Sequence, residues 1–350
     1  MLARQTHMTS LALIRRKRVL DSDGRVLVKP GDRPDPAGLI ARANGPTRHQ
    51  LVDVAGMLGE ERSQFPNRLI QRQVGEQVEI GDILARQGNL LRKIVRTPVE
   101  GTIVAIGGGQ VMIETRTEGP GVVAGFPGIV KEILPDRGAV LETSGALLQG
   151  MWGNGKLGQG PLILRGALPD EPFTVSQRES DLKDCVLVSG AGTDRQSLLY
   201  AERLGIAGLV LGSLSSSLLD LAEHVPFPII LIDGFGKNGM NVVAYRIFQS
   251  LIQQNCYLLA DSWDKSTGRR PECIIPLLAD GVRTPELYEF LPGQYVRLNC
   301  QPYIGQTGLL NEILPAWEMA PFGRQTPLGT VKLENQQIIQ VPLANLDILE

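Results

Sequence analysis

The 350-residue sequence predicts a multidomain fold with β modules at its two ends and an α/β domain between them. Short alternating strands, interrupted by glycine and proline, fill residues 15–150 and predict a β domain there. Continuous apolar strands alternate with helical patterns over residues 180–275, which is typical of a parallel sheet covered on both faces. Residues 288–350 return to short strands and predict a second, smaller β module.

The composition argues against several classes of protein. A hydrophobic content of 43% and a charged content of 21% are typical of a globular protein, and a formal net charge of −2 argues against a strongly basic nucleic-acid binder. The four cysteines are dispersed without a C-x-x-C pair, which predicts reduced thiols and a cytoplasmic location. The three histidines are also scattered, so we expect no metal site. No apolar run reaches about 18 residues, so we expect no membrane span.

A basic run, RRKR at residues 15–18, has two interpretations. It fits a solvated strand, and it also fits a contact with nucleic acid. Because no aromatic side chain interleaves with it, the solvated strand is favoured.

An internal repeat is present in the first domain. VKPGDRPDPAGLIAR at residues 28–42 and RQVGEQVEIGDILAR at residues 72–86 align at a spacing of 44 residues. Each copy has a glycine and a carboxylate at a predicted turn, followed by a predicted strand. The aligned pairs are Gly31 and Gly75, Asp32 and Glu76, Leu39 and Ile83, Ile40 and Leu84, Ala41 and Ala85, and Arg42 and Arg86. Between the copies, residues 49–59 predict a short helix.

The second copy, followed by TPVEGTIVAI at residues 97–106, resembles the biotinyl/lipoyl-type barrel-sandwich hybrid. The resemblance implies one small barrel in which the two copies are half-motifs. Carrier members of that family hold a modified lysine at a hairpin tip, which here falls on Leu90 or Leu91. Lys93 is nearby but off the family's spacing. The resemblance therefore implies a non-carrier relative without a cofactor, whose hairpin is a contact surface.

A glycine-rich segment, GFGKNG at residues 234–239, is the main chemical feature of the α/β domain. It matches G-x-G-x-x-G between a predicted strand and a predicted helix, a context in which backbone amides can hold a phosphate. The candidate ligand-binding residues are Gly234, Gly236, Lys237 and Gly239, and Asp261 at the end of the next strand is the candidate ribose-binding acid. The alternative is a tight turn at the carboxyl edge of the sheet, because Asp233 directly before it would repel an anion.

The C-terminal segments PGQYVRLNCQPYIGQTGLLNEI (residues 292–313) and GTVKLENQQIIQVPLANLDIL (residues 329–349) are similar to the KOW motif of transcription factors and ribosomal proteins. This resemblance implies an SH3-like barrel that docks on protein or RNA. Arg297, Tyr303 and Gly305 match the motif and are the candidate partner-binding residues. Because basic residues are sparse in this region, a protein partner is favoured over nucleic acid.

Two functional hypotheses follow. The preferred one is a non-catalytic cytoplasmic scaffold or adaptor built from binding modules, docking on transcription or translation machinery if the C-terminal resemblance holds. The alternative is a sensor or enzyme that binds a nucleotide or an anionic metabolite at residues 234–239. The order of modules resembles that of bacterial multidomain proteins without an assigned activity.

Overall fold

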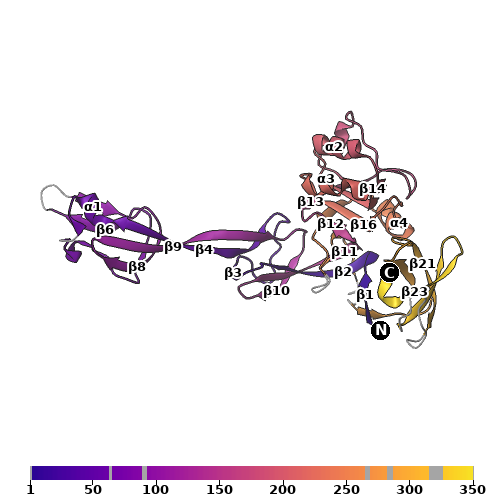
Figure 1. The fold of residues 1–350 in the computed structure, drawn as a ribbon, viewed down its shortest axis with the longest axis horizontal. Helices are drawn as coiled ribbons and strands as arrows, with labels where there is room; N and C mark the ends of the chain where they lie inside the picture. Colours follow the sequence, from indigo (N-terminus) through magenta and orange to yellow (C-terminus); the bar gives the residue numbers. More distant parts are fainter. Residues whose placement is uncertain are drawn as a thin grey trace.

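The computed structural model describes residues 2–62, 65–88, 93–264, 269–281, 287–314 and 326–349. These residues form mostly β-structure, arranged in several sheets with few helices. Two small β lobes extend to one side of the molecule, and the central and C-terminal parts lie at the other side (Figure 1). Within these ranges no sheet closes on itself, so neither of the two predicted barrels is closed.

No helix in the described ranges is both long enough and apolar enough to cross a bilayer.

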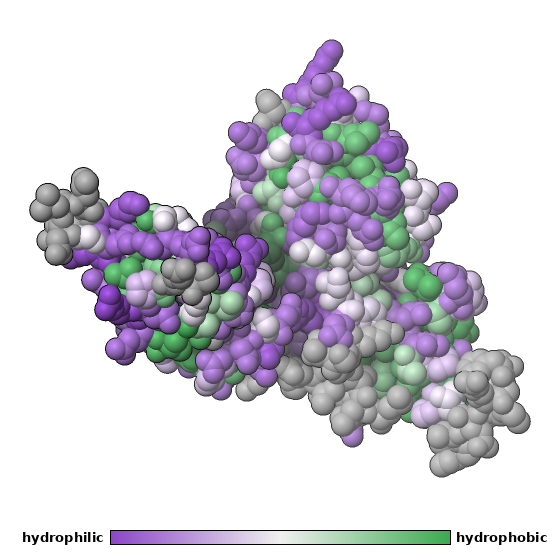
Figure 2. All heavy atoms as spheres, turned by 60° about the vertical axis from the view of Figure 1, so that its left-hand side comes forward, coloured by the Kyte–Doolittle hydropathy of each residue, from purple (hydrophilic) through white to green (hydrophobic). Residues whose placement is uncertain are grey.

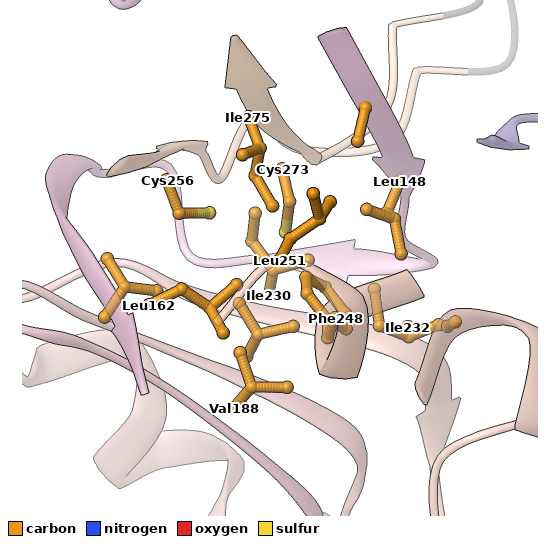
Figure 3. Close-up of a cluster of buried hydrophobic side chains, with 14 of the residues drawn as sticks. Leu148, Leu162, Val188, Ile230, Ile232, Phe248, Leu251, Cys256, Cys273 and Ile275 are labelled. Atoms are coloured by element: carbon orange, nitrogen blue, oxygen red, sulfur yellow. The ribbon is translucent and has the colours of Figure 1, made fainter. Parts of the chain in front are cut away.

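Four neighbouring strands of the central sheet run parallel, three of them within the predicted α/β domain at residues 180–275 and the fourth before it. Helices α2 (Arg195–Leu204) and α3 (Leu219–His224) pack on one face, and α4 (Val242–Ser250) packs on the other. Figure 3 shows Phe248 of α4 among the buried side chains of that second face. The parallel strands are β13 (Leu157–Leu164), β14 (Val186–Gly192), β15 (Gly208–Leu214) and β16 (Ile229–Phe235).

The central sheet continues beyond the parallel strands into antiparallel ones. The predicted fourth parallel strand, β17 (Asn255–Leu259), pairs antiparallel with β13 and then with β18. The sheet crosses residue 150, so the predicted domain boundary does not coincide with a break in strand pairing. The remaining strands of this ten-stranded sheet are β2 (Met8–Val19), β10 (Ile129–Leu134), β11 (Gly138–Gln149), β12 (Trp152–Gly153) and β18 (Glu272–Pro276).

The two lobes are joined by two long antiparallel strands, β4 (Leu39–Asp53) and β9 (Gln110–Val123). We call residues 24–43 with 119–142 the inner module, residues 51–114 the outer module, and residues 44–50 with 115–118 the neck. Figure 1 shows the outer module at the far end of this ribbon. The other elements of the lobes are β3 (Gly24–Val26), α1 (Val54–Leu58), β5 (Gln77–Val78), β6 (Ile83–Gln87), β7 (Lys93–Arg96) and β8 (Gly101–Gly107).

The internal repeat corresponds to a real structural duplication, but its two copies do not form one barrel. Ile40 belongs to the core of the inner module, and its counterpart Leu84 belongs to the separate core of the outer module. The expectation of two half-motifs in one barrel is therefore wrong. Each copy folds with its own return segment, and the outer module is inserted into the hairpin of the inner one.

The return segments repeat as well, at a spacing of 27 residues. In the inner module the amide of Gly31 donates to Val130 O at 2.8 Å, and in the outer module the amide of Gly75 donates to Ile103 O at 2.7 Å. The reciprocal bonds, from Val130 to Asp32 and from Ile103 to Glu76, are both 2.9 Å long. Even the register shift in the hairpin recurs, between Leu39 and Ala41 in one copy and between Ile83 and Ala85 in the other.

The neck is a two-stranded ribbon without a hydrophobic core. None of its described side chains is buried. The pairing of β4 with β9 is irregular here, with register shifts between Arg42 and Asn44 and between Asn44 and Thr47. A Cβ on Gly45 would lie 2.2 Å from Thr117 O, so a glycine is needed where the strands approach. Among the described residues, backbone pairing and side chains that are exposed or half-buried therefore connect the outer module to the rest.

The C-terminal sheet has seven strands and includes the N-terminal strand of the chain. β1 (Leu2–Thr6) runs parallel to β24 (Leu346–Leu349), a pairing that the sequence analysis did not predict. The sheet has the order β19-β1-β24-β20-β21-β22-β23. Its other strands are β19 (Leu287–Glu289), β20 (Tyr295–Leu298), β21 (Thr307–Leu314), β22 (Leu328–Leu333) and β23 (Ile338–Pro342).

Candidate functional site

The glycine-rich loop lies where the sequence places it, between β16 and α4 at the carboxyl edge of the parallel strands. One amide of the loop and the amide directly after it are bonded to protein acceptors. Gly236 N donates to Leu214 O at 2.9 Å, and Met240 N donates to Pro169 O at 2.7 Å. A phosphate cradle requires amides that point at the ligand, so these bonds remove donors that it would use.

The N-terminus of α4 is also occupied by side chains of the chain itself. Asn241 caps the helix by accepting from Ala244 N at 2.9 Å. Asp233 in turn accepts from Asn241 N and from Asn241 Nδ2, both at 2.8 Å. Asp233, which directly precedes the glycine-rich loop, is therefore hydrogen-bonded to the N-cap residue of α4 that follows the loop.

Close packing explains one glycine of the loop and a glycine of β15 beside it, and a positive φ explains another. A Cβ on Gly239 would lie 2.3 Å from Pro169 O, and a Cβ on Gly212 of β15 would lie 2.3 Å from Met240. Gly234 has a φ of +95°, which disfavours any residue with a side chain. Lys237 is exposed on the loop. The motif thus satisfies the requirements of a tight turn, which was the alternative interpretation of the sequence.

Asp261 lies at the opposite edge of the parallel strands from this loop. It follows β17, which runs antiparallel to β13 with Leu259 opposite Leu157, at the amino end of β13. Its carboxylate faces Arg18 at 3.9 Å. The prediction that Asp261 binds a ribose beside the glycines is therefore wrong, because strand direction reverses at β17.

Arg297, predicted as a partner contact, is fully buried beneath the same loop. Its Nη1 donates to Ile232 O at 2.6 Å and lies 3.4 Å from Asp233 Oδ1. Its Nη2 lies 3.1 Å from Asp347 Oδ2 on the neighbouring strand β24. A side chain without accessible surface cannot contact a partner in this arrangement, so the structure places Arg297 in an internal contact instead.

The other two KOW-like residues are half-buried and also contact the interior of the protein. Gly305 has a φ of +81°, and a Cβ there would lie 3.2 Å from Asp233 O. Tyr303 packs against the core of the C-terminal sheet, and its hydroxyl accepts from Gln337 Nε2 at 3.3 Å. The glycine-rich loop and the KOW-like turn, predicted in different domains, therefore meet at Asp233.

Arg270 completes a buried charge network at this junction. Its Nη1 donates to Thr6 Oγ1 at 2.8 Å and lies 3.5 Å from Asp347 Oδ2. Its guanidinium stacks over Trp263 at 4.4 Å from the ring centroid. The two arginines thus balance the carboxylates of Asp233 and Asp347. We call these four residues the junction network; it links the central sheet, the C-terminal sheet and the N-terminal strand.

Burial and charge act differently on the two carboxylates. Burial raises the pKa of Asp233, and the charge of Arg297 with the hydrogen bonds of Asn241 offsets this only in part. Burial also opposes ionisation of Asp347, but the charges of Arg297 and Arg270 outweigh it and lower the pKa. Asp347 is therefore the carboxylate that the two arginines hold ionised.

Sequence reasoning missed Asp347 and Thr6 altogether, and it treated Asp233 only as an obstacle to anion binding. An available signal was an aspartate inside an apolar strand, as in LIDG and NLDIL, because a buried carboxylate requires a partner. What the sequence does not show is which arginine supplies the charge. Arg297 and Asp233 are 64 positions apart.

The basic run at residues 15–18 lies on β2 and is largely paired. Arg16 Nε donates to Glu272 Oε2 at 2.6 Å, and Arg15 Nε donates to Glu142 Oε2 at 2.5 Å. Arg18 Nε donates to Val123 O at 3.0 Å. These contacts support the strand interpretation of the run. Leu90 and Leu91, the expected hairpin tip, lie outside the described residues.

In the described ranges, no group of three or more histidine, cysteine or acidic side chains is arranged to hold a metal ion.

A pair of substitutions tests the structural role of the loop. Gly239→Ala should lower the free energy of unfolding by about 1–3 kcal/mol, because the new methyl group would overlap the backbone of the 169–170 segment. Lys237→Ala should change it by less than about 0.5 kcal/mol, because Lys237 is exposed. Urea unfolding curves measure both. Equal stability of the Gly239 variant and the wild type would contradict the packing account.

No family model matches the chain. A search of curated proteins also returns no relative.

Proposed function

We propose that the chain is a non-catalytic scaffold or adaptor whose outer module is presented to a protein partner at the end of the neck. The observation that carries this proposal is the nested duplication. A second copy of the inner module is inserted into that module's own hairpin and is joined to the rest by two strands only. The insertion places the folded outer module away from the central sheet. The central and C-terminal parts remain joined by the junction network.

We propose that the inner module and the outer module are both relatives of the barrel-sandwich hybrid. Each has a glycine-acid turn, a hairpin and a glycine-containing return, the pattern on which that resemblance rests. Lys93, the lysine nearest to the carrier position, begins β7, and its Nζ donates to Leu58 O at 2.7 Å. A lysine bonded to the end of α1 supports a relative that carries no prosthetic group.

The C-terminal sheet is proposed as an SH3-like relative, with docking on transcription or translation machinery as the prediction of that resemblance. Arg297 is buried and Gly305 packs against Asp233, so we place the partner contact on exposed side chains of the sheet. Tyr295, Lys332 and Ile338 lie in one row across β20, β22 and β23, and Tyr295 and Ile338 are exposed. A cytosolic location is part of the proposal and is supported by four free cysteines.

The nucleotide hypothesis receives no comparable support. The amides of Gly236, Met240 and Asn241 are bonded within the protein, and Asp233 occupies the space beside them. We therefore give the loop a structural role in this proposal.

Affinity capture with the tagged full chain tests the adaptor function. The control is a variant in which an Asn-Gly turn replaces residues 47–116 and closes the neck as a hairpin. The proposal expects a stoichiometric protein partner with the full chain that is lost with the control. A full chain that recovers no stoichiometric partner, or the same partners as the control, would contradict presentation by the outer module.

A further inference from the structure

A Gly-Pro dipeptide occurs on each of the two strands that join the lobes. β4 contains Gly45-Pro46, and β9 contains Gly119-Pro120. Proline has no amide hydrogen, so neither Pro46 nor Pro120 can donate a hydrogen bond to the opposite strand. Within sheets, proline is confined to strand starts, edges and bulges. Both strands are therefore weakened within the same short part of the ribbon.

Both dipeptides lie in bulges of the β4–β9 pairing. Around them the paired residues are, in chain order of β4, Arg42 with Gly121, Asn44 with Glu118, and Thr47 with Arg116. Gly119-Pro120 lies opposite one residue of β4, and Gly45-Pro46 lies opposite one residue of β9. The two bulges have opposite senses, and the single pair of Asn44 with Glu118 separates them. Because a bulge leaves residues unpaired and bends its strand, the ribbon is interrupted twice in succession.

The glycines of the two bulges bring the backbones into direct contact. A Cβ on Gly45 would lie 2.2 Å from Thr117 O, and a Cβ on Gly119 would lie 2.8 Å from Ala43 O. Glycine at these positions supplies no side chain that could brace one strand against the other.

The side-chain contacts described across the bulges are made by accessible groups. Thr117 Oγ1 donates to Pro46 O at 3.2 Å. Arg42 forms an ion pair with Glu118, whose side chain is 74% exposed. Exposed ion pairs contribute little to stability and are screened by salt. These contacts therefore give the ribbon little resistance to bending.

Packed bodies lie on both sides of the bulges. Ala43 packs with Leu20 and Ala41 at the end of the inner module. The core of the outer module begins at Val52 on β4 and Ile113 on β9, and among the described residues its members all lie between positions 52 and 113. Hydrophilic side chains cover much of the outer module on the face that Figure 2 shows. Two packed bodies are therefore joined through the least packed part of the ribbon.

The rest of the ribbon is regular. Beyond the bulges the pairing continues without a register shift from Thr47 with Arg116 to Asp53 with Gln110. Any bending between the two packed bodies is therefore concentrated at the two Gly-Pro bulges.

We propose that the two Gly-Pro bulges are a hinge about which the outer module turns as a rigid body within milliseconds. Such hinges use a few residues to absorb the change in backbone angles, and their motions fall in the microsecond to millisecond range. A two-stranded ribbon bends more easily out of its own plane than within it, because in-plane bending must lengthen one strand relative to the other. The outer module should therefore swing toward and away from the two faces of the ribbon. The hinge is a property of the free chain and does not depend on the proposed adaptor function.

Residual dipolar couplings of the full chain test the hinge. They are measured for backbone amides of the deuterated protein in a weakly aligning medium, and they average over motions that are faster than milliseconds. An alignment tensor is fitted separately to the outer module and to the central sheet. We expect the ratio of the two alignment magnitudes, outer to central, to be below about 0.8, because a squared order parameter below about 0.6 marks a flexible part. A ratio of about 0.8 or more would overturn the hinge.

Pro46→Val with Pro120→Val tests where the hinge lies. Valine can donate to the opposite strand and favours β-structure, so pairing without bulges can form between Arg42 and Thr47. We expect the ratio of the alignment magnitudes to rise toward one. Pro135→Thr is the matched control, because Pro135 is an exposed proline in a turn of the inner module, and it should leave the ratio unchanged.

The outcomes separate the hinge from the adaptor function. A double variant with unchanged amide chemical shifts in both cores and an unchanged ratio would overturn the assignment of the hinge to the Gly-Pro bulges. If the double variant does not fold, the couplings of the wild type still decide whether the outer module turns. A rigid neck removes the hinge and leaves the adaptor proposal standing, whereas a chain without a partner removes the adaptor proposal and leaves the hinge.

Discussion

Arg297→Met should lower the free energy of unfolding by about 3–5 kcal/mol, the usual cost of removing one partner from a buried ion pair. Arg297 has no accessible surface and contacts Asp233 and Asp347. Methionine fills part of the space, but it leaves Asp233 without its cation and Asp347 with Arg270 alone. Urea unfolding at neutral pH measures the loss. Because the network joins the two sheets, hydrogen exchange should increase in β20, β24 and the 234–241 segment together.

The free energy of unfolding lost in Arg297→Met should depend on pH in a defined direction. Burial raises the pKa of Asp233 in the folded protein, and removing Arg297 removes the attraction that opposes this. A group with a raised folded pKa contributes stability below its unfolded value, about 3.8, and loses it as the pH rises through the folded value. The deficit of the variant relative to the wild type should therefore be smaller near pH 4 than at pH 7.

Arg15→Met is the control for this experiment. Arg15 pairs with Glu142, but its side chain is 44% exposed, so its loss should cost about 1 kcal/mol or less. An Arg297 variant as stable as the Arg15 variant would contradict a structural role for the junction network. It would leave Arg297 available for another function.

Leu84→Ala and Ile40→Ala should each cost about 2–5 kcal/mol, but in different parts of the molecule. The two residues are counterparts in the duplication, and both are fully buried. Leu84 packs within the core of the outer module, and among the described side chains of the neck none is buried to connect that core to the rest. Ile40 packs in a core that includes Leu147 and Ile274 of the central sheet.

Hydrogen exchange with mass spectrometry distinguishes the two variants. Leu84→Ala should lose protection within residues 51–114 and leave the central strands unchanged. Ile40→Ala should lose protection in the inner module and in β11 and β18 as well. Leu51→Ala is the control, because Leu51 is 48% exposed in the outer module. If both variants lost the same hydrogen-exchange protection in the central strands, the stability of the outer module would be coupled to that of the central sheet through the neck. That result would contradict the separation of the two cores.

Local turn chemistry made part of this fold predictable. The glycine-acid turns at residues 29–32 and 73–76 are specified by four adjacent residues, and both form as expected. Helices α2 and α4 are also where the sequence places them, because their apolar periodicity and polar N-caps act within a few residues. The 27-residue spacing of the return segments was missed, because those segments share little more than a glycine and two apolar residues.

The sequence by itself determined the local elements of this protein: its turns, its strands, its helices and the presence of a repeat. Only the tertiary structure decided how they combine. Whether a repeat forms one barrel or a module nested in another depends on whether β4 pairs with a nearby strand or with β9, some 70 positions away. Whether Gly305 and Arg297 face a partner or Asp233 depends on the docking of two sheets. Turn and helix preferences act between neighbours in the chain, whereas strand pairing and burial of charge act between residues that only the folded chain brings together.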